Sequence, residues 1–234
     1  DEGMYVLKFR GAGQGTRALI AELIAGEMAR ALGLNVPEIV LVNLDPELAR
    51  TEPDPEIQHL IRASAGVNLA LDYLPGSVTF DAIAETPAGE LASAIVWFDA
   101  FVSNVDRTPR NTNLLMWHRR LWLIDHGAAL YFHHGGDDWI ARSADPFARI
   151  ADHVLLPFAD ALASVDPGLT QRLESNVIDT IVQQVPDNWF GDGSGNDAVN
   201  ANRLRSAYAD YLNSRLQAPH AFLEEAIRAR SSLL

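Results

Sequence analysis

Acidic and amide side chains cluster in one stretch of the sequence, at positions 104–127. Within it, Asp106, Asn111 and Asp125 could do chemistry, because carboxylate and amide oxygens are the ligands that Mg²⁺ prefers. The chain contains no cysteine, which argues against a thiolate metal site. Phosphoryl transfer needs one acid to orient or deprotonate a hydroxyl, and a second carboxylate and an amide to hold metal. The stretch therefore predicts a phosphotransfer centre.

Two short apolar runs between the amide and the second acid predict a β-hairpin, because both are rich in strand-forming residues and a polar trio separates them. With the turn centred on Arg119, we expect Asn113 to lie opposite Asp125, and Asn111 to emerge at the same edge as Asp125. This register leaves open whether Asn111 or Asn113 is the metal ligand. The alternative is an ordinary turn followed by a plain strand end.

The loop that carries Asp106 is expected to be irregular, because Pro109 lacks a backbone donor and disfavours helix just before it. It follows a segment whose apolar residues recur at helical spacing, with Pro87 as the first helical residue. A buried helix therefore delivers the loop. Trp97 and Phe101 on this helix are expected to be core residues rather than ligand contacts.

The residue pattern of these motifs resembles that of the HipA-like kinase family. Asn-Val-Asp-Arg-x-x-x-Asn, then a hairpin, then Ile-Asp-His-Gly follows the protein-kinase-like order of catalytic loop and metal-binding acid. The resemblance implies that Asp106 is the catalytic base and that Asn111 and Asp125 hold Mg²⁺. Arg107 would belong to the catalytic loop, where it either neutralises charge or only pairs with an acid.

A second candidate region lies near the start of the chain, where Lys8 stands alone in an apolar run that predicts a strand. An amphipathic helix is expected over 16–32, with Gly33 as its stop. In kinases such a lysine holds the α and β phosphates of ATP and a helix glutamate orients it. Glu22 matches that role, and Glu27 is the reserve because the sequence does not fix which side faces the cleft. The alternative for Lys8 is a strand lysine whose ammonium reaches water.

Glycines at 11, 13 and 15 follow this lysine instead of preceding it, and no Lys-Ser or Lys-Thr makes them a P-loop. Their backbone amides could cradle phosphate, or the segment is a flexible connection. The chain begins Asp1-Glu2-Gly3 without an initiator methionine. We therefore expect either that preceding residues were removed or that the phosphate-covering hairpin of relatives is absent.

A strand is also expected to run into the turn Pro75-Gly76. By the resemblance this is the hinge between two lobes, where backbone groups of Leu71, Asp72 and Tyr73 meet the adenine edge of ATP. The alternative is a plain strand exit. Residues 39–42 predict a further strand, followed by a surface excursion over 45–56.

Histidines and acids gather in the segment 131–139, which contains His133 and His134. Adjacent histidines on a Gly-rich loop lack the helical spacing of a zinc pair, so a polar loop is expected. The alternatives are a metal site or a substrate-positioning segment of the kind that kinases carry after the metal-binding acid.

The remainder of the chain reads as helical from position 143 onward, interrupted by prolines and by a glycine-rich linker at 191–195. An α/β start followed by helices predicts an α+β, bilobal, protein-kinase-like fold. Its parts would be a small, trimmed, β-rich N-lobe at 1–74 and a larger, mainly helical C-lobe at 75–234.

Composition limits the partners. A formal net charge of −13 over 234 residues, with no basic run, argues against nucleic acid and anionic membranes. No apolar stretch is long enough to span a bilayer, no signal peptide is visible, and the lack of cysteine fits a cytoplasmic protein.

The leading hypothesis is an ATP- and Mg²⁺-dependent phosphotransferase of the HipA-like type that moves the γ-phosphoryl group to a hydroxyl, most plausibly of a protein serine or threonine. A small-molecule kinase would share the same catalytic residues, so the sequence does not separate these acceptors. The alternative from another class is a nucleotide-binding pseudokinase or scaffold, motivated by the missing glycine-rich hairpin.

Overall fold

The computed structural model describes residues 3–13, 15–135, 138–174, 176–191, 197–217 and 219–233. The strands are β1 (Tyr5–Lys8), β2 (Ile39–Leu44), β3 (Gly66–Asp72), β4 (Val78–Thr79), β5 (Leu114–Trp117) and β6 (Arg120–Leu123). The helices are α1 (Gly15–Ala31), α2 (Pro55–Ala63), α3 (Gly89–Phe101), α4 (Leu162–Arg172), α5 (Val177–Gln183), α6 (Asp197–Arg215) and α7 (Ala221–Ser231). Short 3₁₀ helices connect several of them. None of the described helices has the length and apolar character needed to cross a membrane.

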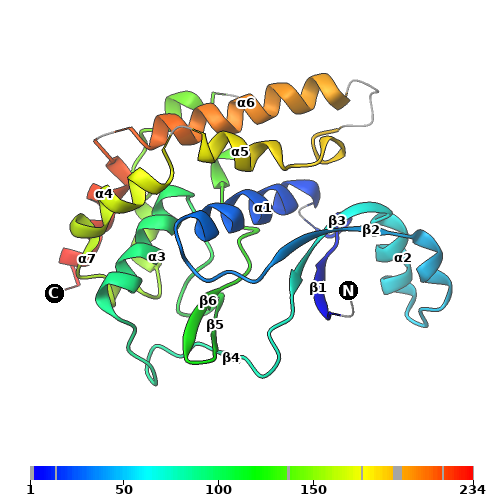
Figure 1. Ribbon diagram of the computed structural model, residues 1–234, viewed down its shortest axis with the longest axis horizontal. Coiled ribbons are helices and arrows are strands. Elements are labelled where there is room, and N and C mark those ends of the chain that lie inside the picture. Colours follow the sequence, from blue (N-terminus) through cyan, green and yellow to red (C-terminus); the bar gives the residue numbers. More distant parts are fainter. Residues whose placement is uncertain are drawn as a thin grey trace.

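One antiparallel sheet, in the order β1-β3-β2, forms from the first third of the chain. Lys8 pairs with Leu69 across β1 and β3, and Leu41 pairs with Leu69 from the other side. The three strands predicted around this lysine, at 39–42 and before the Pro-Gly turn are confirmed. Helix α2 projects beyond the end of this sheet (Figure 1).

Helix α1 packs between β2 and β3 on one side and α5 on the other, and α5 in turn lies beside α6 (Figure 1). Burial on both sides explains why α1 is apolar around most of its circumference. The helix ends as predicted at Gly33, whose φ of +82° is the left-handed conformation that glycine adopts without strain. The N–H of Leu34 closes the end by donating to the carbonyl of Ala29 at 2.9 Å.

The second sheet, β4-β5-β6, contains the predicted hairpin but in a different register. Trp117 pairs with Arg120, so the turn consists of two residues, His118 and Arg119, both with positive φ. The predicted register, with the turn centred on Arg119 alone, was wrong. A two-residue turn with positive φ at both positions is favoured because its twist matches that of the two strands. As a result the carbonyl of Asn113 accepts from the N–H of Ile124 at 3.1 Å, one residue before Asp125.

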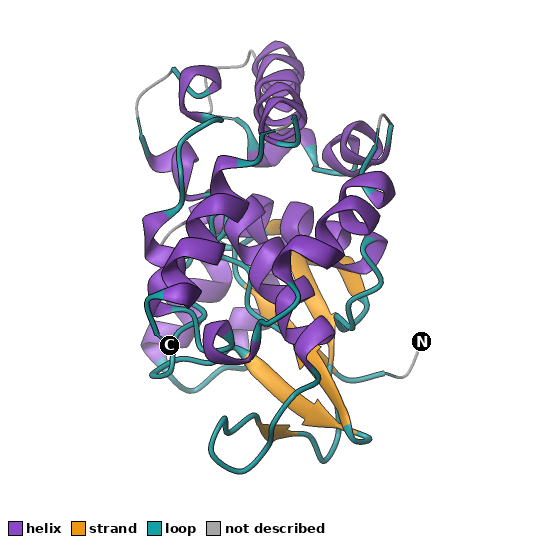
Figure 2. Ribbon diagram, turned by 90° about the vertical axis from the view of Figure 1, so that its left-hand side faces the viewer, coloured by secondary structure: helices purple, strands orange, loops and turns teal. Residues whose placement is uncertain are grey.

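The remainder is mainly helical, as expected, and helices make up most of the molecule while the strands gather toward one end (Figure 2). Pro167 was expected to interrupt a helix, but it lies inside α4. Helix α3 begins at Gly89 rather than Pro87, and no side chain caps it. Trp97 and Phe101 are fully buried and stacked, which confirms them as core residues. Most of the predicted glycine-rich linker lies outside the described residues.

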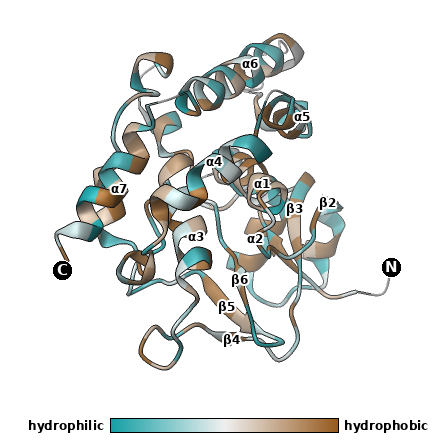
Figure 3. Cartoon of the chain, turned by 60° about the vertical axis from the view of Figure 1, so that its left-hand side comes forward, coloured by the Kyte–Doolittle hydropathy of each residue, from teal (hydrophilic) through white to brown (hydrophobic). Residues whose placement is uncertain are grey.

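A single hydrophobic core runs from α1 through α3 to α7. Figure 3 shows β5 as hydrophobic and α6 as mixed, in keeping with a helix that buries one side. Hydrogen bonds also tie the two ranges of the predicted lobes together: the indole of Trp189 donates to the carbonyl of Val67 at 2.9 Å, and the Asn35 amide donates to Leu121 at 3.0 Å. The fold is mixed α/β, and the division into lobes at 74/75 stays a prediction.

Candidate functional site

Lys8 lies at the centre of a charged cluster formed by three distant parts of the chain. Its ammonium donates to Asp125 Oδ1 at 2.7 Å, although the two residues are 117 positions apart, and lies 3.7 Å from Glu22 Oε2. Burial lowers the pKa of Lys8, but the charge of Glu22 and the hydrogen bond to Asp125 outweigh that effect and raise it. The alternative of a lysine that simply reaches water does not describe this arrangement. Of the two candidate glutamates, Glu22 faces Lys8, whereas Glu27 pairs with Arg30 at 3.7 Å.

Glu22 is itself almost fully buried on α1, and His126 lies behind it. The Nδ1 atom of His126 is 3.5 Å from Glu22 Oε1, too poorly aligned to count as a hydrogen bond. Burial alone would raise the pKa of Glu22, but the proximity of His126 and the charge of Lys8 lower it below its ordinary value. Glu22 therefore stays ionised and can hold Lys8 in place.

The loop between α3 and β5 brings the other predicted site residues together. Asp106 Oδ2 accepts from the amide of Asn111 at 2.7 Å and from that of Asn113 at 3.3 Å. Both amide oxygens are thereby turned away from Asp106, and neither has a hydrogen-bond partner in the described part of the chain. Asn113 and Asp125 both adopt left-handed backbone, which Asn and Asp tolerate better than other side chains. The oxygen donors of Asn111 and Asp125 have the chemistry that Mg²⁺ prefers.

Arg107 points away from this set of oxygens into the protein interior. Its side chain is fully buried and donates to Asp99 Oδ2 at 2.6 Å. The same guanidinium donates to the backbone carbonyls of Asn113 and Ile124, the two residues that flank the start and end of the hairpin. Of the two roles predicted for Arg107, pairing with an acid is the one that this geometry supports.

Asp99 is the anchor of that network, and sequence reasoning missed it. Its carboxylate also accepts from Asn104 at 2.8 Å and from His153 Nε2 at 2.9 Å. The Nδ1 atom of His153 accepts the N–H of Leu155, which fixes the tautomer with the proton on Nε2. An acid inside the apolar run at the end of α3 was the available signal, because a buried carboxylate requires partners.

A pocket of about 260 Å³ opens beside Lys8 and Asp125. Its walls include the end of β3, where Leu71, Asp72 and Tyr73 were predicted to meet a base. The N–H groups of Asp72 and Tyr73 already donate to Glu38 and Met4 at 2.9 Å. Among the described residues of this wall, the N–H of Leu74 has no partner, which makes it the available donor.

The glycine segment after β1 behaves as a connection in its described part. The N–H of Gly11 donates to Ser64, that of Ala12 to Phe9 and that of Gly15 to Ala12. These three groups are therefore committed within the protein, which weakens the case for a phosphate cradle. Gln14, in the middle of the segment, lies outside the described residues.

The predicted histidine loop forms a 3₁₀ turn at Tyr131–His134, and positions 136–137 of the loop lie outside the described residues. His133 is buried, with Nδ1 2.8 Å from the hydroxyl of Tyr208 and Nε2 3.0 Å from His134 Nε2. No group of three or more histidines and acids that could hold a metal occurs within the described ranges. Both ring nitrogens of His133 therefore have polar partners inside the protein.

The buried position of His133 predicts a pH dependence of stability. Burial, together with the charges of His134 and Arg17, lowers the pKa of His133 to about 3. The unfolded chain, with an ordinary histidine pKa of about 6.5, binds the proton first. The free energy of unfolding is therefore expected to fall as the pH drops from about 6.5 toward 3. In urea unfolding, His133→Gln should show a shallower decline, and equal slopes for both proteins would contradict the prediction.

The mixed α/β fold of the chain is kinase-like. The family model described as HipA-like kinase matches residues 1–218. The chain therefore belongs to the HipA-like kinase family, which confirms the resemblance seen in its motifs.

The fold is also similar to the crystal structure of the Helicobacter pylori proinflammatory kinase CtkA. The TM-score is 0.55 and the sequences are 13% identical, over 100% of this chain and 93% of that chain. At this identity the likeness concerns the fold alone. No curated protein matched the sequence. Membership of the family supports a kinase function.

Proposed function

We propose that the protein is an ATP- and Mg²⁺-dependent phosphotransferase that moves the γ-phosphoryl group of ATP to the hydroxyl of a protein serine or threonine. One observation carries this proposal. The ammonium of Lys8 lies within 3.7 Å of carboxylate oxygens of Glu22 and Asp125, and both Lys8 and Asp125 line a pocket. Asp106 and Asn111 form a second polar pair on the loop before β5. Kinase chemistry uses these residue types.

ATP would enter the pocket beside Lys8. The apolar side chains of Val6 and Leu71 offer surfaces for the base, and the N–H of Leu74 offers it a hydrogen bond. Lys8 would then grip the α and β phosphates. Glu22, held ionised in the interior, would keep the ammonium of Lys8 oriented while Asp125 releases it.

Mg²⁺, when bound, would neutralise charge on the phosphates. Asp125 and Asn111 would hold it, with Asn113 as the neighbouring amide. Asp106 would accept the proton of the attacking hydroxyl at Oδ1, because its Oδ2 already accepts from the two amides. Arg107 would act only as a positioning residue, since its guanidinium is buried against Asp99.

The remaining parts of the proposal concern organisation and location. The range 1–74 would carry the phosphate- and adenine-binding residues, and 75–234 would carry the catalytic loop and Asp125. The cytoplasm is the proposed location, because ATP is available there and the chain has no cysteine to oxidise.

Two substitutions test the proposal directly. Lys8→Met and Asp125→Asn are each expected to lower phosphoryl transfer from labelled ATP at least ~10²-fold, because each removes a charge that acts on the phosphates. Transfer is measured with Mg²⁺, with and without a cell extract as the source of acceptor. Asp210→Asn, the same chemical change at an exposed site on α6, is the control and should transfer at the wild-type rate.

Three outcomes separate the possibilities. Loss of transfer in both variants but not in the control supports the proposal. ATP binding without transfer by the wild type would instead indicate a nucleotide-binding scaffold. Equal transfer by wild type and both variants would place the chemistry elsewhere in the chain.

A further inference from the structure

Two cavities continue the nucleotide pocket along the catalytic loop. The first, about 480 Å³, shares Leu115 and Ile124 with the nucleotide pocket. The second, about 600 Å³, shares Pro109, Arg110 and Val154 with the first. The first cavity therefore adjoins both the nucleotide pocket and the second cavity. We call the first and second cavities together the loop groove.

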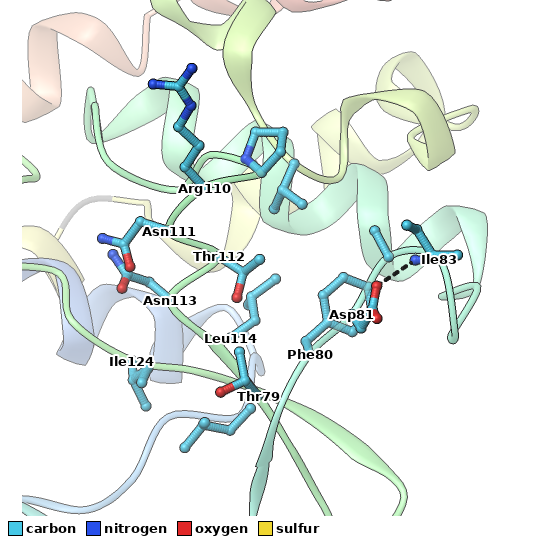
Figure 4. A pocket seen from close by; sticks show the side chains of 14 residues that line it. Thr79, Phe80, Asp81, Ile83, Arg110, Asn111, Thr112, Asn113, Leu114 and Ile124 are labelled. Carbon is cyan, nitrogen blue, oxygen red and sulfur yellow. Dashed lines mark hydrogen bonds between the residues drawn. The ribbon is translucent and has the colours of Figure 1, made fainter.

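The loop groove passes the proposed reaction centre. Asn111 and Asn113 line its first cavity, and their amides bond to Asp106. Figure 4 shows Thr112 and Leu114 on one wall of this cavity and Phe80, Asp81 and Ile83 on the other. Asp106 itself lines neither cavity, so the groove borders the proposed reaction centre through these two amides.

Arg110 is the one lysine or arginine among the described residues that line either cavity. It is exposed, and it has no ion pair or hydrogen bond with any residue in the described part of the chain. Two acids also line the groove. Asp81 already accepts the N–H of Ile83 at 2.8 Å, and Asp152 is exposed in the second cavity. Neither acid pairs with Arg110, so its positive charge is available to a ligand, in a protein whose net charge is −13.

Three features fit a chain-like ligand. Each cavity alone is as large as many complete small-ligand pockets, so a ligand that uses both must be extended. The side chain of Ile83, 98% exposed at the wall of the first cavity, offers an apolar contact. Strand β4 lies at the edge of its sheet, where an extended peptide can add through main-chain hydrogen bonds.

We propose that the loop groove binds the phosphoryl acceptor as an extended polypeptide segment, and that Arg110 selects segments with an acidic side chain close to the acceptor hydroxyl. This inference rests on the proposed phosphotransferase function and adds the class of its substrate. Arg110 extends from the loop at the end of the first cavity away from Thr79, which places it where the two cavities join (Figure 4).

The test compares serine peptides that differ only in the residues flanking the serine, which are Asp, Asn or Lys. With the full chain, ATP and Mg²⁺ at low salt, kcat/KM is expected to be about five- to tenfold higher for the Asp peptide than for the Lys peptide. The difference should shrink as ionic strength rises. Arg110→Glu should reverse the order of the peptides, and Arg110→Lys should keep it. Arg119→Glu, the same charge change on the β5–β6 turn outside the groove, should leave the order unchanged.

Reversal by Arg110→Glu alone supports the inference. Transfer to all three peptides at one rate, or an order that Arg110→Glu does not alter, overturns it and leaves the phosphotransferase proposal standing. Transfer to a small hydroxyl compound but to none of the peptides also overturns it. Absence of any Asp106-dependent turnover, with every acceptor, overturns the proposed function as well.

Discussion

Asp106→Asn is expected to lower the rate of phosphoryl transfer by about 10²- to 10⁴-fold, which is the usual cost of losing a general base. The substitution removes the charge that we propose accepts the hydroxyl proton. It keeps the shape of the side chain and an oxygen that can accept from the Asn111 and Asn113 amides, as Asp106 Oδ2 does. The effect should therefore fall on chemistry and not on folding.

The measurement is single-turnover transfer of labelled phosphate to an acceptor protein or peptide, with nucleotide affinity and thermal unfolding recorded on the same samples. Asp106 does not line the nucleotide pocket, so ATP affinity should change by less than about twofold. Asp210→Asn on α6 serves as the matched control. A variant that transfers phosphate at the wild-type rate would remove Asp106 from the mechanism, and one that fails to fold would show up in the unfolding curve.

The parts of the fold that local patterns could predict are those with strong local causes. Gly33 ends α1 because only a residue at ease with positive φ fits there, and the strands around Lys8 and in the β5–β6 hairpin follow from short apolar runs. The hairpin register could not be predicted in the same way. Its turn, His118-Arg119, lacks the Asn-Gly type of signal that marks a two-residue turn, and a shift of one position changes every pair.

The site shows the same division between local and long-range causes. The motifs pointed to Lys8, Glu22, Asp106 and Asp125. The structure joins the first two to Asp125 through ion pairs, whereas Asp106 bonds to the amides of its own loop. The orientation of Arg107 depended on an acid eight positions earlier and on a histidine far along the chain. No spacing rule connects those three residues. Only the folded structure therefore shows that Arg107 is buried and paired with Asp99 rather than exposed in the loop.

The buried ion pair between Asp99 and Arg107 makes Asp99→Asn the substitution with the largest expected effect on stability. Asp99 is the only carboxylate bonded to Arg107 in the described structure, and both side chains are fully buried. Removing one partner of a buried pair leaves an uncompensated charge and typically costs about 3–5 kcal/mol in the free energy of unfolding. Activity should fall too, because Arg107 also holds the carbonyls of Asn113 and Ile124, and with them the positions of the residues proposed to bind metal.

The pH dependence gives this prediction a second readout. Burial would raise the pKa of Asp99, but the charge of Arg107 and the hydrogen bond from His153 outweigh it and hold the pKa far below the ordinary value. A depressed pKa in the folded state means that the stabilisation is complete above the unfolded pKa of about 3.9 and is lost as the pH falls below it. The difference in unfolding free energy between wild type and Asp99→Asn should therefore be largest near neutral pH and shrink below about pH 4.

A double substitution separates the cost of leaving one buried charge unpaired from the other effects of each substitution on the free energy of unfolding. Asp99→Leu combined with Arg107→Met removes both charges, so it should cost less than the sum of the two single changes, with a coupling of about 0.5–3 kcal/mol. Urea unfolding of the four proteins measures that coupling. Strict additivity would mean that Asp99 and Arg107 stabilise the fold independently. In that case the catalytic loop would have to owe its position to the backbone bond from Val154 to the Arg107 carbonyl, at 3.1 Å, and not to the ion pair.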